Sequence, residues 1–386
     1  MDFELSQKAI DFRSQVKKFI SENLTSEITL KMHETGTFND KSFNESLAAE
    51  GLLAGAVPGY GDRDPVELYL LFNELEKAGA PYDGLAVTML VAGVINAVGT
   101  EFHREEVLNK LLTGKHNCCL GYSEPDYGSD VASIITKAEK IENRWVINGQ
   151  KMWTTMAHES DWVLLLTRTN SDVPKHKGMT MFLVPMNTPG IEIQPVATMA
   201  SERTNATFYD NVEVEDQWRL GEIDDGWSVM GVALALERGV MGGTNPAVPL
   251  LKHVLNWAET TPSKNKSLMI DNALMRERIA RTAIINQVGQ LLTLRAAWIA
   301  ATGGMPGVEG SMAKIYASEE YQKVVGWFQQ MAGAEGLLSF GAEDAAASGW
   351  IDYDARHAPV TTIYGGTSEI NRNNIAERHL GLPRNR

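Results

Sequence analysis

The hydrophobic period changes twice along this chain of 386 residues, and this change is what most constrains its fold. Up to about residue 115 apolar residues recur at helical spacing, as in 66–78 (VELYLLFNELEKA). Short β-type runs then follow, such as 161–168 (DWVLLLTR) and 178–186 (GMTMFLVPM). After about residue 222 the helical period returns. The order helix, β, helix predicts an α+β protein with an N-terminal all-α domain (1–115), a middle β domain (116–222) and a C-terminal all-α domain (223–386).

Local patterns place elements within these segments. A first helix is predicted by apolar residues at helical spacing, namely Leu5, Ala9, Phe12, Val16 and Phe19. In the middle segment, 145–147 is predicted to be a strand that meets a turn at Asn148-Gly149. A late helix ending at Gly303-Gly304 is predicted by the stripe Ile284, Val288, Leu291 and Leu292. This order is not the alternation that builds a parallel nucleotide-binding sheet, and no GxGxxG motif follows a strand.

Composition excludes several classes of protein. The formal net charge of −14 argues against nucleic acid, whose binding needs clustered Lys and Arg. The longest apolar run, 85–99, contains Asn96 and is shorter than the roughly 20 residues that span a bilayer. The first residues include Asp2 and Glu4 and are interpreted as a helix rather than a targeting peptide. The two cysteines, Cys118-Cys119, are neighbours and cannot easily form an ordinary disulfide, so we expect a cytoplasmic protein.

Two polar segments of the β region carry groups that suit a flavin. The first, 121–130 (GYSEPDYGSD), offers backbone N–H groups, a hydroxyl and a glycine that allows close approach to ring-edge atoms and a phosphate. The second, 149–155 (GQKMWTT), offers Trp153 for stacking and Thr155 for a hydrogen bond. Either segment alone is also typical of an ordinary turn or of a core tryptophan. The pair at this spacing favours the functional interpretation.

With the closing segment 362–372 (TIYGGTSEINR), these motifs resemble the acyl-CoA dehydrogenase family over the whole chain. Asp126-Tyr127 depart from the small residues usual at that point. The resemblance implies a β-barrel or sandwich in the middle domain and a four-helix bundle in the last. It implies FAD as cofactor and no metal, with electrons passing to an electron-transfer flavoprotein. The cofactor-binding residues implied by the resemblance are Leu120, Tyr122, Ser123, Gly128, Ser129, Trp153, Thr155, Gln330, Gly333, Thr367 and Glu369.

The family reaction converts an acyl-CoA thioester to the trans-2-enoyl-CoA and needs a carboxylate to take the α-proton. At the position of the usual glutamate this chain has Gly365. Isovaleryl- and long-chain acyl-CoA dehydrogenases instead place the glutamate on the first helix after the β domain, and 234–239 (LALERG) matches that setting. We therefore predict Glu237 as the base, with Arg238 as a neighbouring charge that favours its ionised form.

The loss of the glutamate side chain at Gly365 has two further implications. The backbone N–H of Gly365 remains able to donate to the thioester oxygen, because it does not depend on the side chain. The missing side chain leaves room beside the α-carbon, which suggests a branched or ring-bearing acyl group.

Residues that a family member lends to its neighbour's FAD are altered here. The family arginine aligns with Thr261, the following Phe-Gly pair aligns with Lys264-Asn265, and the glycine-rich loop 330–336 (QMAGAEG) has Ala334 in place of a glycine. The chain resembles bacterial enzymes for steroid side chains, which are α2β2 assemblies with a second, related subunit. A homotetramer in which Lys264 or Lys266 replaces the arginine is the alternative. A non-catalytic subunit, or an oxidase or monooxygenase on the same fold, also stays open.

Overall fold

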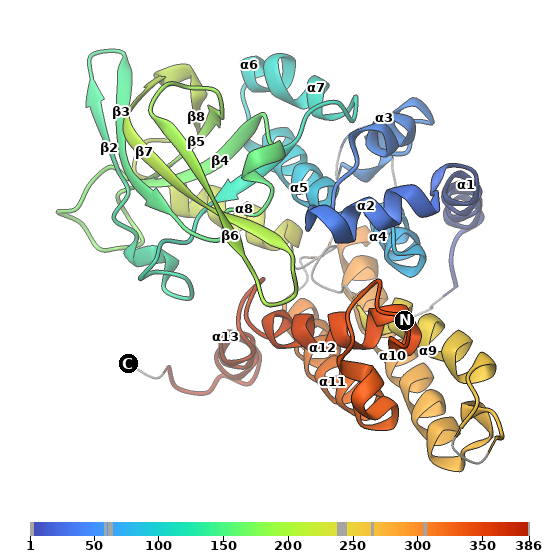
Figure 1. Ribbon diagram of the computed structural model, residues 1–386. Coiled ribbons are helices and arrows are strands. Elements are labelled where there is room, and N and C mark those ends of the chain that lie inside the picture. The colour runs from blue at the N-terminus through green and yellow to red at the C-terminus, as the bar shows by residue number, and fades with distance from the viewer. Residues whose placement is uncertain are drawn as a thin grey trace. The chain divides into compact units, whose positions relative to one another are not determined.

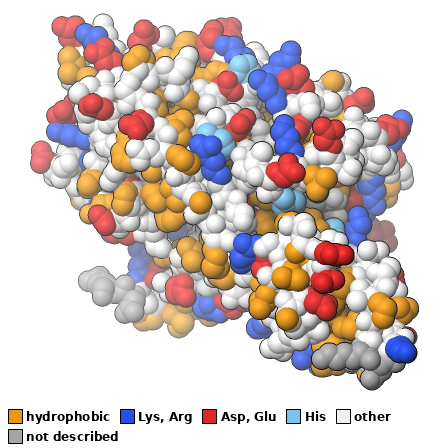
Figure 2. All heavy atoms as spheres, viewed as in Figure 1, with side chains coloured by type: hydrophobic (Ala, Val, Ile, Leu, Met, Phe, Trp, Pro, Cys, Tyr) orange, Lys and Arg blue, Asp and Glu red, His pale blue; other side chains and the backbone are white. Residues whose placement is uncertain are grey.

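The structure, a computed structural model, describes residues 4–57, 60, 65–237, 245–263, 266–302, 304 and 307–384. Its internal contacts divide the chain into two compact units. The N-terminal unit comprises Leu5–Phe72 and Ala80–Glu237, and the C-terminal unit comprises Met1–Glu4, Asn73–Gly79 and Arg238–Arg386. Among the described residues, no helix combines the length and the apolar character needed to cross a bilayer. On the face shown in Figure 2, basic and acidic side chains are interspersed with hydrophobic ones.

The first predicted helix is confirmed as α1 (Gln7–Asn23). The Ser6 side chain caps it by accepting a hydrogen bond from Ala9 N, and Phe12, Val16 and Phe19 are buried along one face. Further along the chain, α5 (Asp83–Val98) is apolar on almost every side, which suits its buried position against β1 (Cys118–Gly121) and α8 (Gly226–Leu236). The other α-helices that lie wholly or partly in this unit are α2 (Ser26–Thr35), α3 (Lys41–Ala49), α4 (Pro65–Ala78), α6 (Glu101–His103) and α7 (Asn109–Leu111).

The middle of the chain forms one sheet with the order β6-β7-β3-β2-β4-β5-β8 (Figure 1), and β1 pairs with β4. The strands are β1 (Cys118–Gly121), β2 (Lys137–Ile141), β3 (Arg144–Lys151), β4 (Trp162–Arg168), β5 (Met179–Pro185), β6 (Ile191–Ala197), β7 (Arg203–Glu215) and β8 (Arg219–Leu220). The predicted strands in 161–168 and 178–186 are thus confirmed as β4 and β5. Both are almost wholly buried, because one face joins the core of the sheet and α8 packs on β5.

The turn predicted at Asn148-Gly149 is wrong. β3 continues through these residues, and its register against β7 shifts between Ile147 and Gly149. Gly149 has φ +148°, and an added Cβ would lie 2.6 Å from Thr136 Oγ1, so only glycine fits this β-bulge. The chain reverses earlier, at Glu142, where φ is +53°. The bulge matters for function because bulges re-aim the side chains that follow them, here the second polar segment.

The C-terminal unit is helical, with α9 (Ala247–Thr260), α10 (Ala273–Ala301), α11 (Glu309–Ala332), α12 (Trp350–Thr361) and α13 (Ser368–Asn374). Its core joins α9, α11 and α12 through residues such as Val254, Phe328 and Ile351. The predicted late helix is confirmed as α10, but its predicted stripe is not the buried face. Ile284 is 63% exposed, whereas Ile285 is 8% exposed.

Candidate active site

The first polar segment begins where β1 ends. Leu120 is the third residue of β1, and it is half-buried, as are Tyr122 and Ser123 just beyond the strand. Gly128 and Ser129 follow and are exposed. A Cβ added at Gly128 would meet no atom within 4 Å. The backbone of this segment therefore faces open space at Gly128, as a binding loop for a phosphate or a ring edge requires.

The far end of this segment is anchored by two charged side chains. Asp130 accepts hydrogen bonds from Lys175 Nζ at 2.8 Å and Ser133 Oγ at 2.7 Å, which hold the pKa of the Asp130 carboxyl below its usual range. The guanidinium of Arg168, a buried residue, donates to the backbone carbonyls of Ala132, Ile134, Lys175 and Lys177. The sequence analysis missed Arg168, because a lone arginine at the end of a strand gives no motif.

The second polar segment presents an exposed indole on a fixed backbone. Trp153 is 57% exposed and has φ +63°, a conformation that a bulky residue rarely adopts. The neighbouring Thr154 is held to Asn205 by reciprocal hydrogen bonds, N to O at 2.8 Å and O from Nδ2 at 3.0 Å. Thr155 Oγ1 is 3.0 Å from Thr204 Oγ1. These hydrogen bonds fix the strained backbone at Trp153, and its indole faces solvent, where a flat ring can stack on it.

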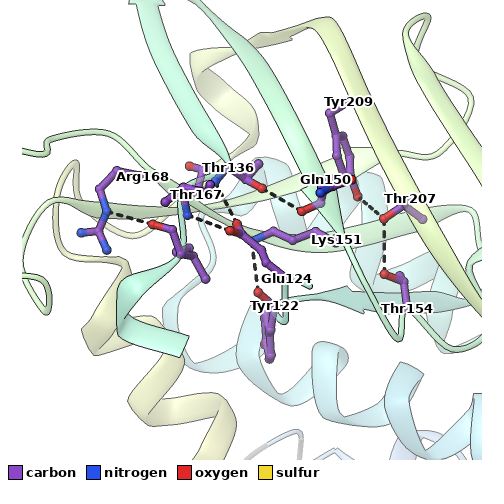
Figure 3. Close-up of polar contacts among 12 residues, drawn as sticks. Tyr122, Glu124, Thr136, Gln150, Lys151, Thr154, Thr167, Arg168, Thr207 and Tyr209 are labelled. Atoms are coloured by element: carbon purple, nitrogen blue, oxygen red, sulfur yellow. Dashed lines mark hydrogen bonds and ion pairs between the residues drawn. The ribbon is translucent and has the colours of Figure 1, made fainter. Parts of the chain in front are cut away.

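A buried ion pair joins the two polar segments (Figure 3). Lys151 Nζ lies 2.9 Å from Glu124 Oε1 and donates to the Tyr122 carbonyl at 3.1 Å. Glu124 also accepts hydrogen bonds from the backbone N–H groups of Ile135 and Thr136, both at 2.8 Å. Neither charged residue was singled out from the sequence. The available signal was that each lies inside one of the two motifs.

The predicted base ends helix α8. Glu237 is half-buried, and its backbone N–H donates to the Ala233 carbonyl. The hydroxyl oxygen of Tyr122 is buried and makes no hydrogen bond within the described part of the chain. Burial and the nearby Glu237 charge raise the pKa of the Tyr122 hydroxyl, which therefore remains a protonated donor at neutral pH. Arg238, predicted as the neighbouring charge, lies outside the described residues.

The closing motif forms the start of α13 in the C-terminal unit. Gly365 has φ +63°, which favours glycine over any side chain, including the usual glutamate. Thr367 caps α13 by accepting a hydrogen bond from Ile370 N at 3.2 Å. Glu369 is exposed, and its own backbone N–H and the Thr367 hydroxyl lower the pKa of its carboxyl. Part of this motif therefore has a local structural role.

Thr367 and Glu369 line a cavity of about 670 Å³ within the C-terminal unit. Its walls come from α11, from α13 and from the turn that precedes α13. Other lining residues are Glu319, Gln322, Lys323, Thr362 and Arg372. Arg372 is paired with Glu319 at 2.7 Å. The cavity has both cationic and anionic walls, so it can receive a polar group.

Gln330 and Gly333 are not gathered with Thr367 and Glu369. Gln330 lies near the other end of α11, eight residues beyond Gln322, which is about 12 Å at the helical rise per residue, and Gly333 follows the last residue of α11. Both are exposed, and Gly333 ends the helix with φ +63°.

Thr261, the counterpart of the family arginine, ends α9. Its N–H donates to the Trp257 carbonyl and its carbonyl accepts from Met269 N, both at 2.9 Å. Its backbone is fixed, and the residue is half-buried. Lys264-Asn265 lie outside the described residues, whereas Lys266 is described and exposed.

Comparison with known proteins agrees with the resemblance. Family models described as the N-terminal, middle and C-terminal domains of acyl-CoA dehydrogenase match residues 6–115, 119–212 and 224–380. Acyl-CoA dehydrogenase IpdE1 of Mycobacterium tuberculosis is 30% identical over 98% of this chain and 99% of its own length. Acyl-CoA dehydrogenase FadE34 of the same organism is 35% identical over 94% of this chain, which spans about half of FadE34 (49%).

Solved structures give the same assignment. The Tcur3481-Tcur3483 steroid ACAD has a TM-score of 0.89 and 27% identity, with both chains fully covered. A chain of the ChsE4-ChsE5 complex from Mycobacterium tuberculosis has a TM-score of 0.88 and 28% identity, again with full coverage of both chains. The three-domain order of helical, β and helical segments is shared with this fold. The chain therefore belongs to the acyl-CoA dehydrogenase family of oxidoreductases.

Proposed function

We propose that the chain binds FAD and dehydrogenates an acyl-CoA thioester to the trans-2-enoyl-CoA, with Glu237 as the base. The observation that carries this proposal is that the two polar segments, 121–130 and 149–155, lie next to each other and expose groups that suit a flavin. Met152 N donates to the Ser123 carbonyl at 2.9 Å, so the segments lie side by side. Trp153 and Ser129, which such a cofactor needs, are exposed.

The residues present fit FAD. Trp153 offers an exposed ring face, Gly128 leaves open space beside its backbone, and the Tyr122 hydroxyl is a buried donor with no hydrogen bond among the described residues. The proposed FAD contacts of the N-terminal unit are completed by Leu120, Ser123, Ser129 and Thr155. In the C-terminal unit, Thr367 and Glu369 supply polar groups at their cavity. When bound, FAD supplies the hydride acceptor for the β-hydrogen.

The chain's own residues then carry the proton chemistry. Glu237 takes the α-proton, and its charge helps to keep the nearby Tyr122 hydroxyl neutral, because it raises the pKa of that hydroxyl. The backbone N–H of Gly365 donates to the thioester oxygen and stabilises the charge that develops there. Arg238 adds a positive charge next to Glu237 in the sequence.

Trp153 allows a direct test of FAD binding. Trp153→Gly removes the indole and places glycine at φ +63°, where glycine is not strained. We expect FAD affinity to fall about threefold to tenfold from lost stacking, while the melting temperature of the apoprotein does not fall. Isothermal titration with FAD and thermal unfolding measure the two effects. Unchanged affinity would remove Trp153 from the cofactor site.

We propose a bulky acyl group as substrate, in line with the steroid named for one similar structure. Gly365 lacks the side chain that usually stands beside the α-carbon, so ring-bearing acyl groups fit there. We expect kcat/KM for a steroid side-chain acyl-CoA to exceed that for a straight short-chain acyl-CoA by roughly tenfold or more. Steady-state kinetics with both classes measure the ratio. A clear preference for short straight chains would contradict this specificity.

We also propose that the chain works in an α2β2 assembly with a second, related subunit. The support is the loss of a guanidinium at Thr261, together with the two-protein complex named for a similar structure. Gln330 and Gly333 are exposed, as residues lent to a neighbour must be. Electrons leave through an electron-transfer flavoprotein. The buried free thiols of Cys118 and Cys119 suit the reducing cytoplasm.

A further inference from the structure

We propose that the buried Lys151–Glu124 pair is a positioning device that fixes the two flavin-contacting segments relative to each other. This inference rests on the proposed FAD site. The Lys151 side chain is fully buried and that of Glu124 is 3% exposed. A buried ion pair contributes little net stability, because desolvation of both charges offsets their attraction. Its position between the two motifs therefore points to a role beyond folding.

The pair joins three stretches of backbone. Lys151 extends from the end of β3 and donates to the Tyr122 carbonyl, while the ring of Tyr122 points away from the ammonium (Figure 3). Glu124 accepts hydrogen bonds from the backbone N–H groups of Ile135 and Thr136, which lie just before β2. With these hydrogen bonds, the ion pair links the segment after β1, the residues just before β2 and the end of β3.

Further hydrogen bonds beside the ion pair connect it to the loop that contains Gly128. Thr136 Oγ1 donates to the Gln150 carbonyl at 3.0 Å, one residue before Lys151. Glu124 N and O exchange hydrogen bonds with Tyr127 O and N at 3.0 and 3.1 Å, which closes the turn leading to Gly128. The residue that binds the ammonium therefore also shapes the loop that presents Gly128.

The electrostatics of the two groups favour an ion pair at neutral pH. Burial raises the pKa of Glu124, but the Lys151 charge and the hydrogen bonds outweigh this and hold it below its usual range. Burial lowers the pKa of Lys151 to about 8, against the opposing effect of Glu124. Both groups are thus charged at neutral pH and carry charge-assisted hydrogen bonds.

The test removes both charges together. The double variant Glu124→Gln with Lys151→Met leaves no lone buried charge, and the glutamine oxygen can still accept a backbone N–H. The matched control is Lys137→Met, which breaks the exposed Lys137–Glu139 pair on β2. Each variant is made in the 386-residue chain, together with the second subunit if one co-purifies.

Two readouts separate positioning from folding. In the double variant without FAD, we expect faster hydrogen exchange at the N–H groups of Met152, Ile135 and Thr136. We also expect FAD affinity to fall about tenfold to a hundredfold, with a changed visible flavin spectrum. Lys137→Met should match the wild type in both measurements. The single variant Lys151→Met should lose more stability than the double variant, because it leaves Glu124 charged and unpaired.

The outcomes distinguish this inference from the proposed function. A folded double variant with wild-type exchange, FAD affinity and flavin spectrum would overturn the positioning role. If that variant merely unfolds at a lower temperature while its FAD affinity stays unchanged, the pair serves folding alone and the inference is wrong. If the wild-type assembly itself binds no FAD, the proposed function fails first, and the exchange measurement still decides whether the pair holds the segments together.

Discussion

Replacing Glu237 with glutamine is expected to lower kcat by roughly 10²–10⁴-fold, while bound FAD is retained. Glutamine has nearly the same shape as glutamate but cannot accept the α-proton. Helix α8 and the polar segments are left intact, so cofactor affinity should not change. Steady-state turnover with an artificial electron acceptor, together with the flavin absorbance of the purified protein, measures both quantities.

The control for this prediction is Glu222→Gln, which removes an exposed carboxylate in the connection between β8 and α8. We expect it to leave kcat within the error of the measurement. Unchanged turnover in Glu237→Gln would remove Glu237 as the base. It would instead favour a subunit that supports the active site of another chain.

The chain purified without its partner is expected to bind FAD about tenfold to a hundredfold more weakly than the assembly does. One charge-assisted contact to the pyrophosphate is missing, because Thr261 stands where a family member lends an arginine to its neighbour. In the co-purified assembly we expect one FAD for each pair of unlike chains. Titration of the apoprotein and the absorbance ratio of the assembly measure these values.

Thr261→Arg provides a gain-of-function test of the same idea. When this chain is purified without the second subunit and forms a homo-oligomer, each copy lends the new guanidinium to its neighbour. The FAD affinity of this homo-oligomer should therefore rise. Thr261→Gln, which adds length without charge, is the matched control and should not raise it. Full FAD occupancy and activity of the unaltered chain alone would exclude an obligate partner. That result would favour the alternative, a homotetramer in which Lys264 or Lys266 replaces the arginine.

Much of the fold was predictable because the strongest patterns are local. The apolar spacing of α1 and the apolar runs of β4 and β5 each specify one element. The turn at Asn148-Gly149 was wrong because this dipeptide also suits a β-bulge, and the choice depends on the contact of Gly149 with Thr136. The stripe that includes Ile284 marked the helix α10 but not its buried face, because period alone does not say which face meets a neighbour.

The candidate site was predictable only where residue types carry chemistry by themselves. Trp153 and Glu237 could be named from motif and setting, and their roles stay predictions. The positive φ of Trp153 and the ion pair of Lys151 with Glu124 could not be seen. A long-range pair joins residues 27 positions apart, and its burial depends on the packing of the whole sheet.

Anaerobic mixing of the co-purified assembly with acyl-CoA tests the central claim most directly. Loss of visible flavin absorbance reports hydride transfer from the β-carbon, without any electron acceptor. A steroid side-chain acyl-CoA is expected to bleach the flavin rapidly in the wild type and not in Glu237→Gln. An oxidised flavin that no acyl-CoA bleaches, whether its acyl group is branched, ring-bearing or straight, would contradict the assignment of this chain as the dehydrogenating subunit.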